Sequence, residues 1–156
     1  MHKIQRTIDI KAPVQRVYDF LTQPANLPGI WPSMMEVSNV VTTSPGASDF
    51  DWVYKMAGLH LKGHTKAVEA QTNRLLHTRS EGAIQSTFRW TFGGLDGSGT
   101  KLTCAVEYTI PVPVIGRLGE AVVAKLNERE MEHVLANLRD VMEHGSAGVA
   151  AGAPAR

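Results

Sequence analysis

Large apolar side chains recur at every second position in two segments of this sequence, and they are its clearest candidates for binding a ligand. A period of two places alternate residues on one face of a β-strand. Aromatic rings and a thioether on such a face can enclose an apolar molecule, although core packing is the simpler explanation for any single one of them. We expect both segments to face one interior: Phe50, Trp52, Tyr54 and Met56 in the first, and Phe88, Trp90 and Phe92 in the second.

Two tyrosines are the candidates for acid–base chemistry in that interior. Tyr54 and Tyr108 alternate in phase with apolar neighbours, so each would carry a hydroxyl into an apolar space. There a phenol can position an enol or a carbonyl and transfer a proton. Arg89 has the opposite phase and should point outwards, and His77 stands alone, so both rank lower. For each tyrosine the alternative is a buried phenol that bonds to the backbone, and the sequence favours that alternative.

The other histidines and the one cysteine do not form a metal or nucleophile site. His60 and His64 would share a strand face roughly 13 Å apart, which is too far for one zinc ion. His133 and His144 fall on a helical segment and should lie in solvent, whereas Cys104 should be a small buried hydrophobe. The sequence contains no nucleophile elbow and no phosphate-binding loop, so we identify no catalytic motif and expect no metal and no cofactor.

Composition favours one folded domain and argues against a polyanionic partner. The chain has 156 residues, of which 43% are hydrophobic and 20% charged, and its formal net charge is +1. This length suits one core, and so small a charge argues against nucleic acid as a partner. We find no apolar run long enough for an integral membrane segment and no secretion signal, so we expect a cytoplasmic protein that is a monomer or a weak homodimer. We expect one domain over residues 1–144 and a disordered tail over 145–156, where small residues predominate.

The alternation of polar and apolar residues predicts seven strands. The first, at 3–11, precedes a helix at 13–22 and a proline-rich segment at 24–32 that can form at most a short helix. The other strands follow one another with turn residues between them, which indicates an antiparallel meander. They lie at 34–43, 49–57, 60–71, 74–81, 84–93 and 100–110.

The last element is predicted to be one long amphipathic helix from about Gly116 to His144. A helix of this length would cross the whole face of a sheet, because it would span roughly 40 Å. We interpret the charged segment from Glu128 to Glu132, which includes Glu130, as a solvated face. The apolar residues at helical spacing are Leu118, Val122, Leu126, Val134, Leu135, Leu138, Val141 and Met142.

Several short motifs agree in order and spacing with one known superfamily. They are the opening from Ile8 to Pro13, the pairs Leu27-Pro28 and Trp31-Pro32, and the closing segment from Tyr108 to Gly116. Over residues 3–143 the chain resembles the helix-grip superfamily of START lipid-transfer domains, plant pollen allergens and bacterial polyketide cyclases. The resemblance implies an α+β fold, in which a seven-stranded curved antiparallel sheet wraps a long carboxy-terminal helix and two short helices separate strands 1 and 2. It also implies a deep cavity for lipids, sterols or aromatic polyketides, and it carries over no catalytic motif.

These observations lead us to expect a protein that binds a small hydrophobic molecule between the sheet and the final helix. The alternatives are a polyketide cyclase, aromatase or dehydratase that uses Tyr54 or Tyr108 in the same cavity, and a protein-interaction module built around Trp31 and its loop. The residues expected to contact the ligand are Trp31, Trp52, Tyr54, Met56, Phe88, Trp90, Cys104, Val106, Tyr108 and Leu126.

Overall fold

The computed structural model describes residues 1–145, which form one antiparallel sheet and the helices that pack on it. The predicted tail, apart from Gly145, lies outside the described residues. The strands are β1 (His2–Ile10), β2 (Met34–Ser44), β3 (Ala47–Met56), β4 (Leu59–Gln71), β5 (Leu75–Gly82), β6 (Ser86–Leu95) and β7 (Gly99–Tyr108). The helices are α1 (Val14–Leu21), the short 3-10 helix η1 (Pro24–Gly29), α2 (Val112–Leu118) and α3 (Glu120–Glu143).

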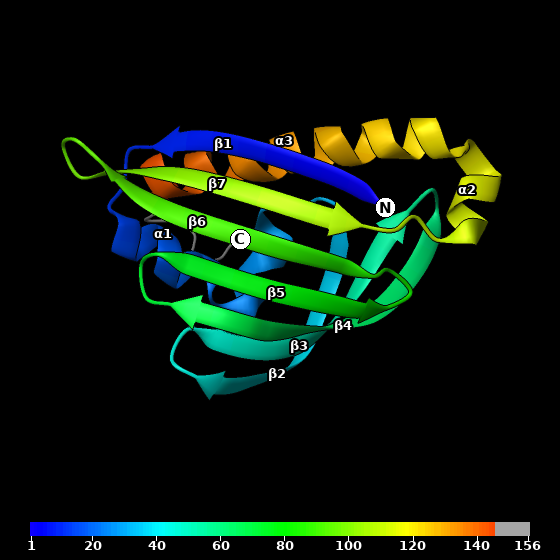
Figure 1. Cartoon of the computed structure of the whole chain (residues 1–156), viewed down its shortest axis with the longest axis horizontal. Helices are drawn as coiled ribbons and strands as arrows, with labels where there is room; N and C mark the ends of the chain where they lie inside the picture. Colours follow the sequence, from blue (N-terminus) through cyan, green and yellow to red (C-terminus); the bar gives the residue numbers. More distant parts are fainter. Residues whose placement is uncertain (146–156) are drawn as a thin grey trace.

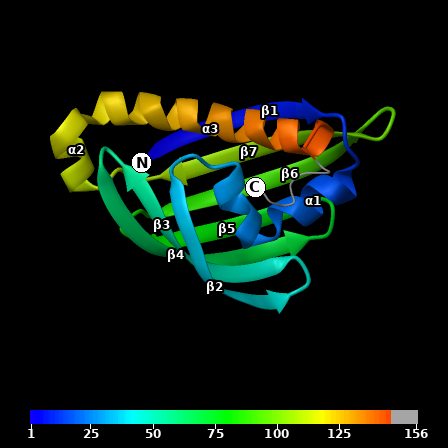
Figure 2. The ribbon, with the colours of Figure 1, turned by 180° about the vertical axis from the view of Figure 1, so that it is seen from behind.

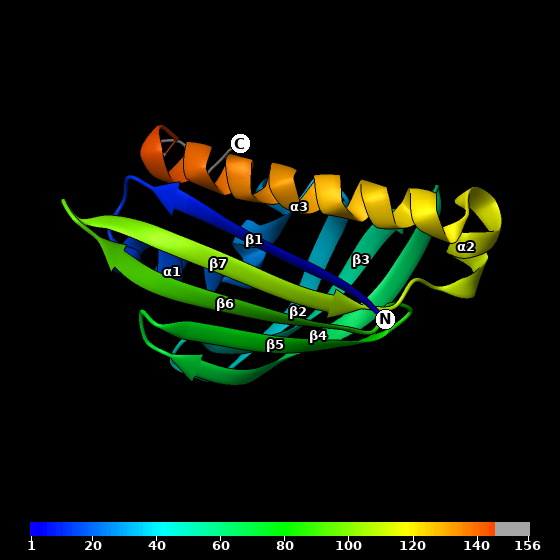
Figure 3. The same ribbon diagram turned by 45° about the horizontal axis from the view of Figure 1, so that its top comes forward.

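The sheet is a meander of β2 to β7 that β1 extends at one edge. Its strand order is β1-β7-β6-β5-β4-β3-β2, and all neighbouring pairs are antiparallel (Figure 1). Irregularities in the β2–β3 and β4–β5 pairings add local twist to a sheet that is strongly curved. The predicted helix-grip architecture is confirmed, because α3 runs along the concave side (Figure 3) and two short helices separate β1 from β2.

The prediction of one continuous final helix is wrong, because the segment is divided at Gly119 into α2 and α3. Gly119 has φ 83°, a backbone conformation that glycine adopts without the penalty other residues incur. Figure 2 shows α2 turned away from the line of α3 at one end of the molecule. The spacing of apolar residues indicates which side of a helix is buried, but it does not reveal a single residue at which the chain turns. The break at Gly119 could therefore not be predicted from that spacing.

The predicted register of the helix is also wrong in its first half. Leu118, Val122 and Leu126 are 42%, 50% and 46% exposed, so they do not face the sheet. The buried stripe of α3 instead passes through Val123 and Met131 and continues into the second half, where Val134, Leu135, Leu138 and Met142 are buried as expected. In the first half two apolar stripes compete at helical spacing, and only the packing against the sheet decides between them.

Polar contacts along β1 hold α3 in place over the sheet. His2 Nε2 lies 2.7 Å from Glu120 Oε2 at the start of the helix, and the Lys11 backbone N–H donates to Glu143 Oε2 at 2.8 Å near its end. Between them Arg6 forms ion pairs with Glu128 at 3.7 Å and Glu132 at 3.3 Å. These two glutamates therefore lie at the outer edge of the helix, as the solvated-face interpretation expected.

The core is densely packed where α1 and the second half of α3 meet β1, β6 and β7. Ile10, Val17, Leu102 and Leu138 are each at most 1% exposed. Tyr18 of α1 packs edge-on against Phe92 of β6, with ring centroids 5.2 Å apart. Phe92 thus belongs to this packed end. Within residues 1–145, no helix combines the length and the apolar character that crossing a bilayer requires.

Candidate functional site

A cavity of about 140 Å³ lies between the concave face of the sheet and the first half of α3. Its walls come from all seven strands, α1, η1 and its following loop, and α3, so they are brought together only by the fold. Most of the side chains around it are apolar. The expected ligand residues that line it are Trp31, Trp52, Tyr54, Met56, Phe88, Trp90, Val106 and Tyr108.

Three aromatic rings form one wall of the cavity. The Trp31 ring meets Phe88 and Trp90 edge-on, with centroids 5.3 and 6.4 Å apart, and Phe88 and Trp90 stack with centroids 6.3 Å apart. Trp31 reaches this wall from the loop after η1, and it is only 6% exposed. Its burial removes the basis for the expectation that Trp31 forms a protein-interaction surface.

Two expected ligand residues lie outside the cavity lining. Leu126 is 46% exposed because the register of α3 turns it towards solvent, so its predicted position is wrong. Cys104 is fully buried, as predicted, but it packs in the core beside the cavity. Burial raises the pKa of its thiol well above the ordinary value, so Cys104 is a neutral hydrophobe.

Tyr54 and Glu130 meet at the polar end of the cavity. The Tyr54 hydroxyl donates to Glu130 Oε2 at 3.4 Å and accepts from Trp31 Nε1 at 3.3 Å. Glu130 Oε2 also accepts from the backbone N–H of Ser33 at 2.8 Å. Burial, together with the negative charge of Glu130, raises the pKa of Tyr54 strongly, so this phenol is a neutral hydrogen-bond donor and not a base at neutral pH.

Tyr108 and Asn127 lie on the same cavity. Burial raises the pKa of Tyr108, the nearby Asn127 side chain partly offsets that rise, and the charge of Glu128 adds to it. Asn127 Nδ2 is buried and has no hydrogen-bond partner among the described residues. An amide donor buried without an acceptor is costly, which makes Asn127 a candidate for contact with a bound molecule.

Asn127 and Glu130 were missed as site residues, and the solvated-face interpretation of Glu130 is wrong. Asn127 lies on the stripe of α3 that faces the sheet, four residues from both Val123 and Met131. Glu130 precedes Met131 directly and also lines the cavity. The signal in the sequence was this spacing, because Val123 to Asn127 to Met131 is as regular a helical stripe as the exposed one. A polar residue in such a stripe suggests a cavity, since a packed core would leave it unpaired.

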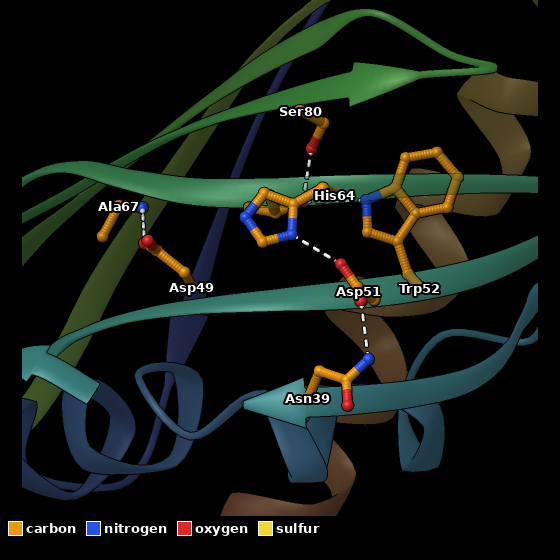
Figure 4. Close-up of polar contacts among 8 residues, drawn as sticks. Asn39, Asp49, Asp51, Trp52, His64, Ala67 and Ser80 are labelled. Carbon is orange, nitrogen blue, oxygen red and sulfur yellow. Dashed lines mark hydrogen bonds and ion pairs between the residues drawn. The ribbon is translucent and has the colours of Figure 1, made fainter. Parts of the chain in front are cut away.

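A second cluster of polar side chains, at the β3–β4–β5 side of the cavity, is joined by hydrogen bonds. Trp52 Nε1 donates to Thr65 Oγ1 at 2.9 Å, and Thr65 Oγ1 lies 2.6 Å from Ser80 Oγ (Figure 4). The Trp52 ring lies over Gly63, where an added Cβ would overlap it. These contacts fix the orientation of the Trp52 ring.

The histidines that the sequence excluded as a metal pair lie on the other face of the sheet. His64 Nδ1 lies 2.6 Å from Asp51 Oδ1, and Asn39 Nδ2 donates to Asp51 Oδ2 at 2.7 Å (Figure 4). The hydrogen bonds from Asn39 and His64 lower the pKa of Asp51. No group of three or more potential ligands gathers around a metal position in the part of the chain that the structure describes.

His77 and Arg89 are neighbours across β5 and β6 and do not line the cavity. Arg89 is exposed, as its phase predicted. Burial lowers the pKa of His77, and the charges of Arg89 and Arg79 lower it further. Neither residue is therefore a candidate for chemistry inside the cavity.

Comparison with known proteins places the chain in a family and identifies its fold. Residues 1–143 match the family described as polyketide cyclase / dehydrase and lipid transport. No curated protein sequence matches the chain. Among solved structures, a protein from Thermus thermophilus is 22% identical with a TM-score of 0.78, and the match covers 93% of this chain and 99% of that one.

Two further structures have descriptive names. The Zhui aromatase/cyclase from Streptomyces sp. R1128 is 16% identical with a TM-score of 0.75, and the match covers 97% of this chain and 99% of that one. A START superfamily protein from Mycobacterium smegmatis is 17% identical with a TM-score of 0.73, and the match covers 92% and 98% of the two chains. At these identities the likeness establishes the fold, and it does not assign the activities of those proteins to this chain.

Proposed function

The chain belongs to the polyketide cyclase / dehydrase and lipid transport family, and on that premise we propose that its cavity binds a small, largely apolar molecule. The observation that carries the proposal is the cavity itself. Aromatic side chains line it, and the protein's own side chains do not fill it. An empty apolar space inside a protein costs stability, so one that is retained suggests a ligand.

The volume of the cavity limits the size of that molecule. A cavity of about 150 Å³ lined by apolar residues is known to hold benzene in another protein. With about 140 Å³, this cavity suits a molecule of roughly one aromatic ring in the conformation described. A lipid or a multi-ring polyketide, which the sequence also allowed, is larger than this volume and would have to extend out of the cavity or displace part of its wall.

A test of binding can use the tryptophans of the protein, because all three of them line the cavity. We expect nitrobenzene, a neutral probe with one aromatic ring and a nitro group that quenches indole fluorescence, to quench the tryptophans saturably. Ala67 lines the cavity, so Ala67→Leu should fill part of it and weaken the quenching strongly. Ala105→Leu is the matched control, since Ala105 has the opposite strand phase to the core residues Cys104 and Val106. Equal quenching of both variants and the native protein would contradict the proposal.

Proton transfer in the same cavity is a second candidate function, because Tyr54 and Glu130 are in contact there. Glu130 would accept a proton from a C–H or O–H group of the bound molecule. Neutral Tyr54 would donate a hydrogen bond to the oxyanion that develops. This is the chemistry that a cyclase or dehydratase needs. With poly-β-ketone substrates, turnover should fall at least tenfold in Glu130→Gln and remain in Glu128→Gln, and equal turnover in both would exclude Glu130 as the base.

A further inference from the structure

We propose that the polar end of the cavity recognises a neutral hydroxyl group, so that the ligand is a small apolar alcohol or phenol and not a carboxylic acid. This inference rests on the proposed binding function and specifies the ligand class of the same site. Two observations carry it, and each concerns a side chain of α3 in the lining of the cavity.

The first observation is that Glu130 is the single charged residue among the described residues that line the cavity. It forms no ion pair within residues 1–145, and its hydrogen bonds come from the neutral Tyr54 hydroxyl and the Ser33 backbone. A ligand carboxylate would add a second negative charge to an apolar space with no cation to balance it. The site should therefore reject fatty acids and other apolar carboxylates.

The second observation is the unpaired donor of Asn127. Its Nδ2 is buried without a hydrogen-bond partner in residues 1–145, and the residue lines the cavity three positions before Glu130. Side chains three apart on a helix are neighbours, with Cβ atoms about 5–6 Å apart. The polar end thus offers an acceptor, Glu130, beside a donor, Asn127, and it requires a group that satisfies both.

A hydroxyl is the simplest group that meets this requirement, because it donates one hydrogen bond and accepts another. An ammonium group can only donate, so it would leave Asn127 unpaired. A ketone or an ether can only accept, so it would leave Glu130 without a new partner. The aromatic wall of Trp31, Phe88 and Trp90 would hold the apolar part of the same molecule.

Four matched compounds test the proposal on the full chain: 2-phenylethanol, phenylacetate, 2-phenylethylammonium and ethylbenzene. They share one ring and differ in the group at its end. By calorimetry at pH 7, we expect 2-phenylethanol to bind about tenfold more tightly than ethylbenzene and more tightly still than phenylacetate. Tighter binding of either phenylacetate or 2-phenylethylammonium than of the alcohol would overturn the proposal.

Variants assign the selectivity to the two residues. Glu130→Gln removes the negative charge, so phenylacetate should bind it about tenfold more tightly than it binds the native protein. Glu128→Gln is the matched control, because Glu128 pairs with Arg6 at 3.7 Å on the outer edge of the helix, and it should leave the ranking unchanged. In Asn127→Leu the advantage of the alcohol over ethylbenzene should disappear. An unchanged ranking in both Glu130→Gln and Asn127→Leu would contradict the assignment.

The outcomes separate this inference from the proposed function. If 2-phenylethanol and ethylbenzene bind equally well, the cavity binds apolar molecules and the hydroxyl assignment is wrong. If none of the four compounds binds, and nitrobenzene also fails to quench the tryptophans, the binding function itself is wrong.

Discussion

The two ends of the space between α3 and the sheet are built from the same secondary structure but are filled differently. Under the second half of α3, Leu138 is fully buried and belongs to one core cluster with residues of α1 and β7. Under the first half, Asn127 and Glu130 occupy positions on the same stripe, and a cavity lies beneath them. The difference shows that one helix can serve as a core element and as the wall of a binding site, according to which residues its buried stripe contains.

The curvature of the sheet explains why the first half can be hollow. Trp31 enters from the loop after η1 and supports the aromatic wall, whereas α1 fills the other end. Removing bulk should therefore be costly at the packed end and better tolerated at the hollow end. The following predictions test this contrast, in order of decreasing effect.

Leu138→Ala should have the largest effect on stability. Leu138 is fully buried at the packed end, so the truncation would create a new cavity and lower the free energy of unfolding by about 2–5 kcal/mol. Met131→Ala, on the same stripe but beside the existing cavity, should cost about half as much or less. Urea denaturation of both variants measures the difference. Equal losses would mean that the two ends are packed alike.

Gly63→Ala should come next, because the added methyl group would overlap the Trp52 ring and the Glu81 carbonyl. We expect a loss of about 1–3 kcal/mol in the free energy of unfolding, as overpacking usually gives. The Trp52 ring would move into the cavity, so nitrobenzene binding should weaken as well. Gly94→Ala is a suitable control, since nothing lies near its added Cβ. Native-like unfolding and binding of Gly63→Ala would contradict the described position of Trp52.

Tyr54→Phe should destabilise the polar end by about 1 kcal/mol, the usual value for one hydrogen-bonded hydroxyl. The variant keeps the ring on the cavity wall, so ethylbenzene should still bind. Thermal unfolding measures the loss. An unfolding temperature equal to that of the native protein would mean that the contacts with Trp31 and Glu130 contribute nothing to stability.

Asp51→Asn should have the smallest effect, and it should appear only in acid. Because hydrogen bonds from Asn39 and His64 lower the pKa of folded Asp51, its contribution to stability is present above the unfolded pKa of about 3.9 and is lost as the pH falls through the folded pKa. The variant should therefore show a shallower loss of stability below about pH 4 in urea titrations. An identical pH dependence in both proteins would contradict this, and ligand binding should be unaffected because Asp51 lies on the outer face.

The sequence predicted the sheet and most of the cavity wall because these depend on alternation along single strands. Trp52, Tyr54, Phe88 and Trp90 face inwards as their phase requires, and Arg89 faces outwards. The family resemblance is confirmed by the match over residues 1–143. The face on which each side chain of a strand lies depends on its position in that strand alone, so it can be predicted from one segment at a time.

The sequence failed on α3 because the required information is not local. The exposed stripe of Val122 and Leu126 is more apolar than the buried stripe that contains Asn127 and Glu130. Hydrophobicity therefore selected the wrong face, since a cavity needs fewer apolar side chains above it than a packed core does. The break between α2 and α3 at Gly119 also depends on the folded chain. So does the contact of Glu130 with Tyr54, which is far away in sequence.

The central claim, that the hollow end binds an apolar ligand, is tested most directly by a titration with 2-phenylethanol followed by nuclear magnetic resonance. We predict saturable shifts of the indole N–H signals of Trp31, Trp52 and Trp90, while the backbone amides of Ile10, Leu102 and Leu138 at the packed end stay in place. Indole signals that do not move, or shifts spread over the outer face of the sheet, would contradict the claim.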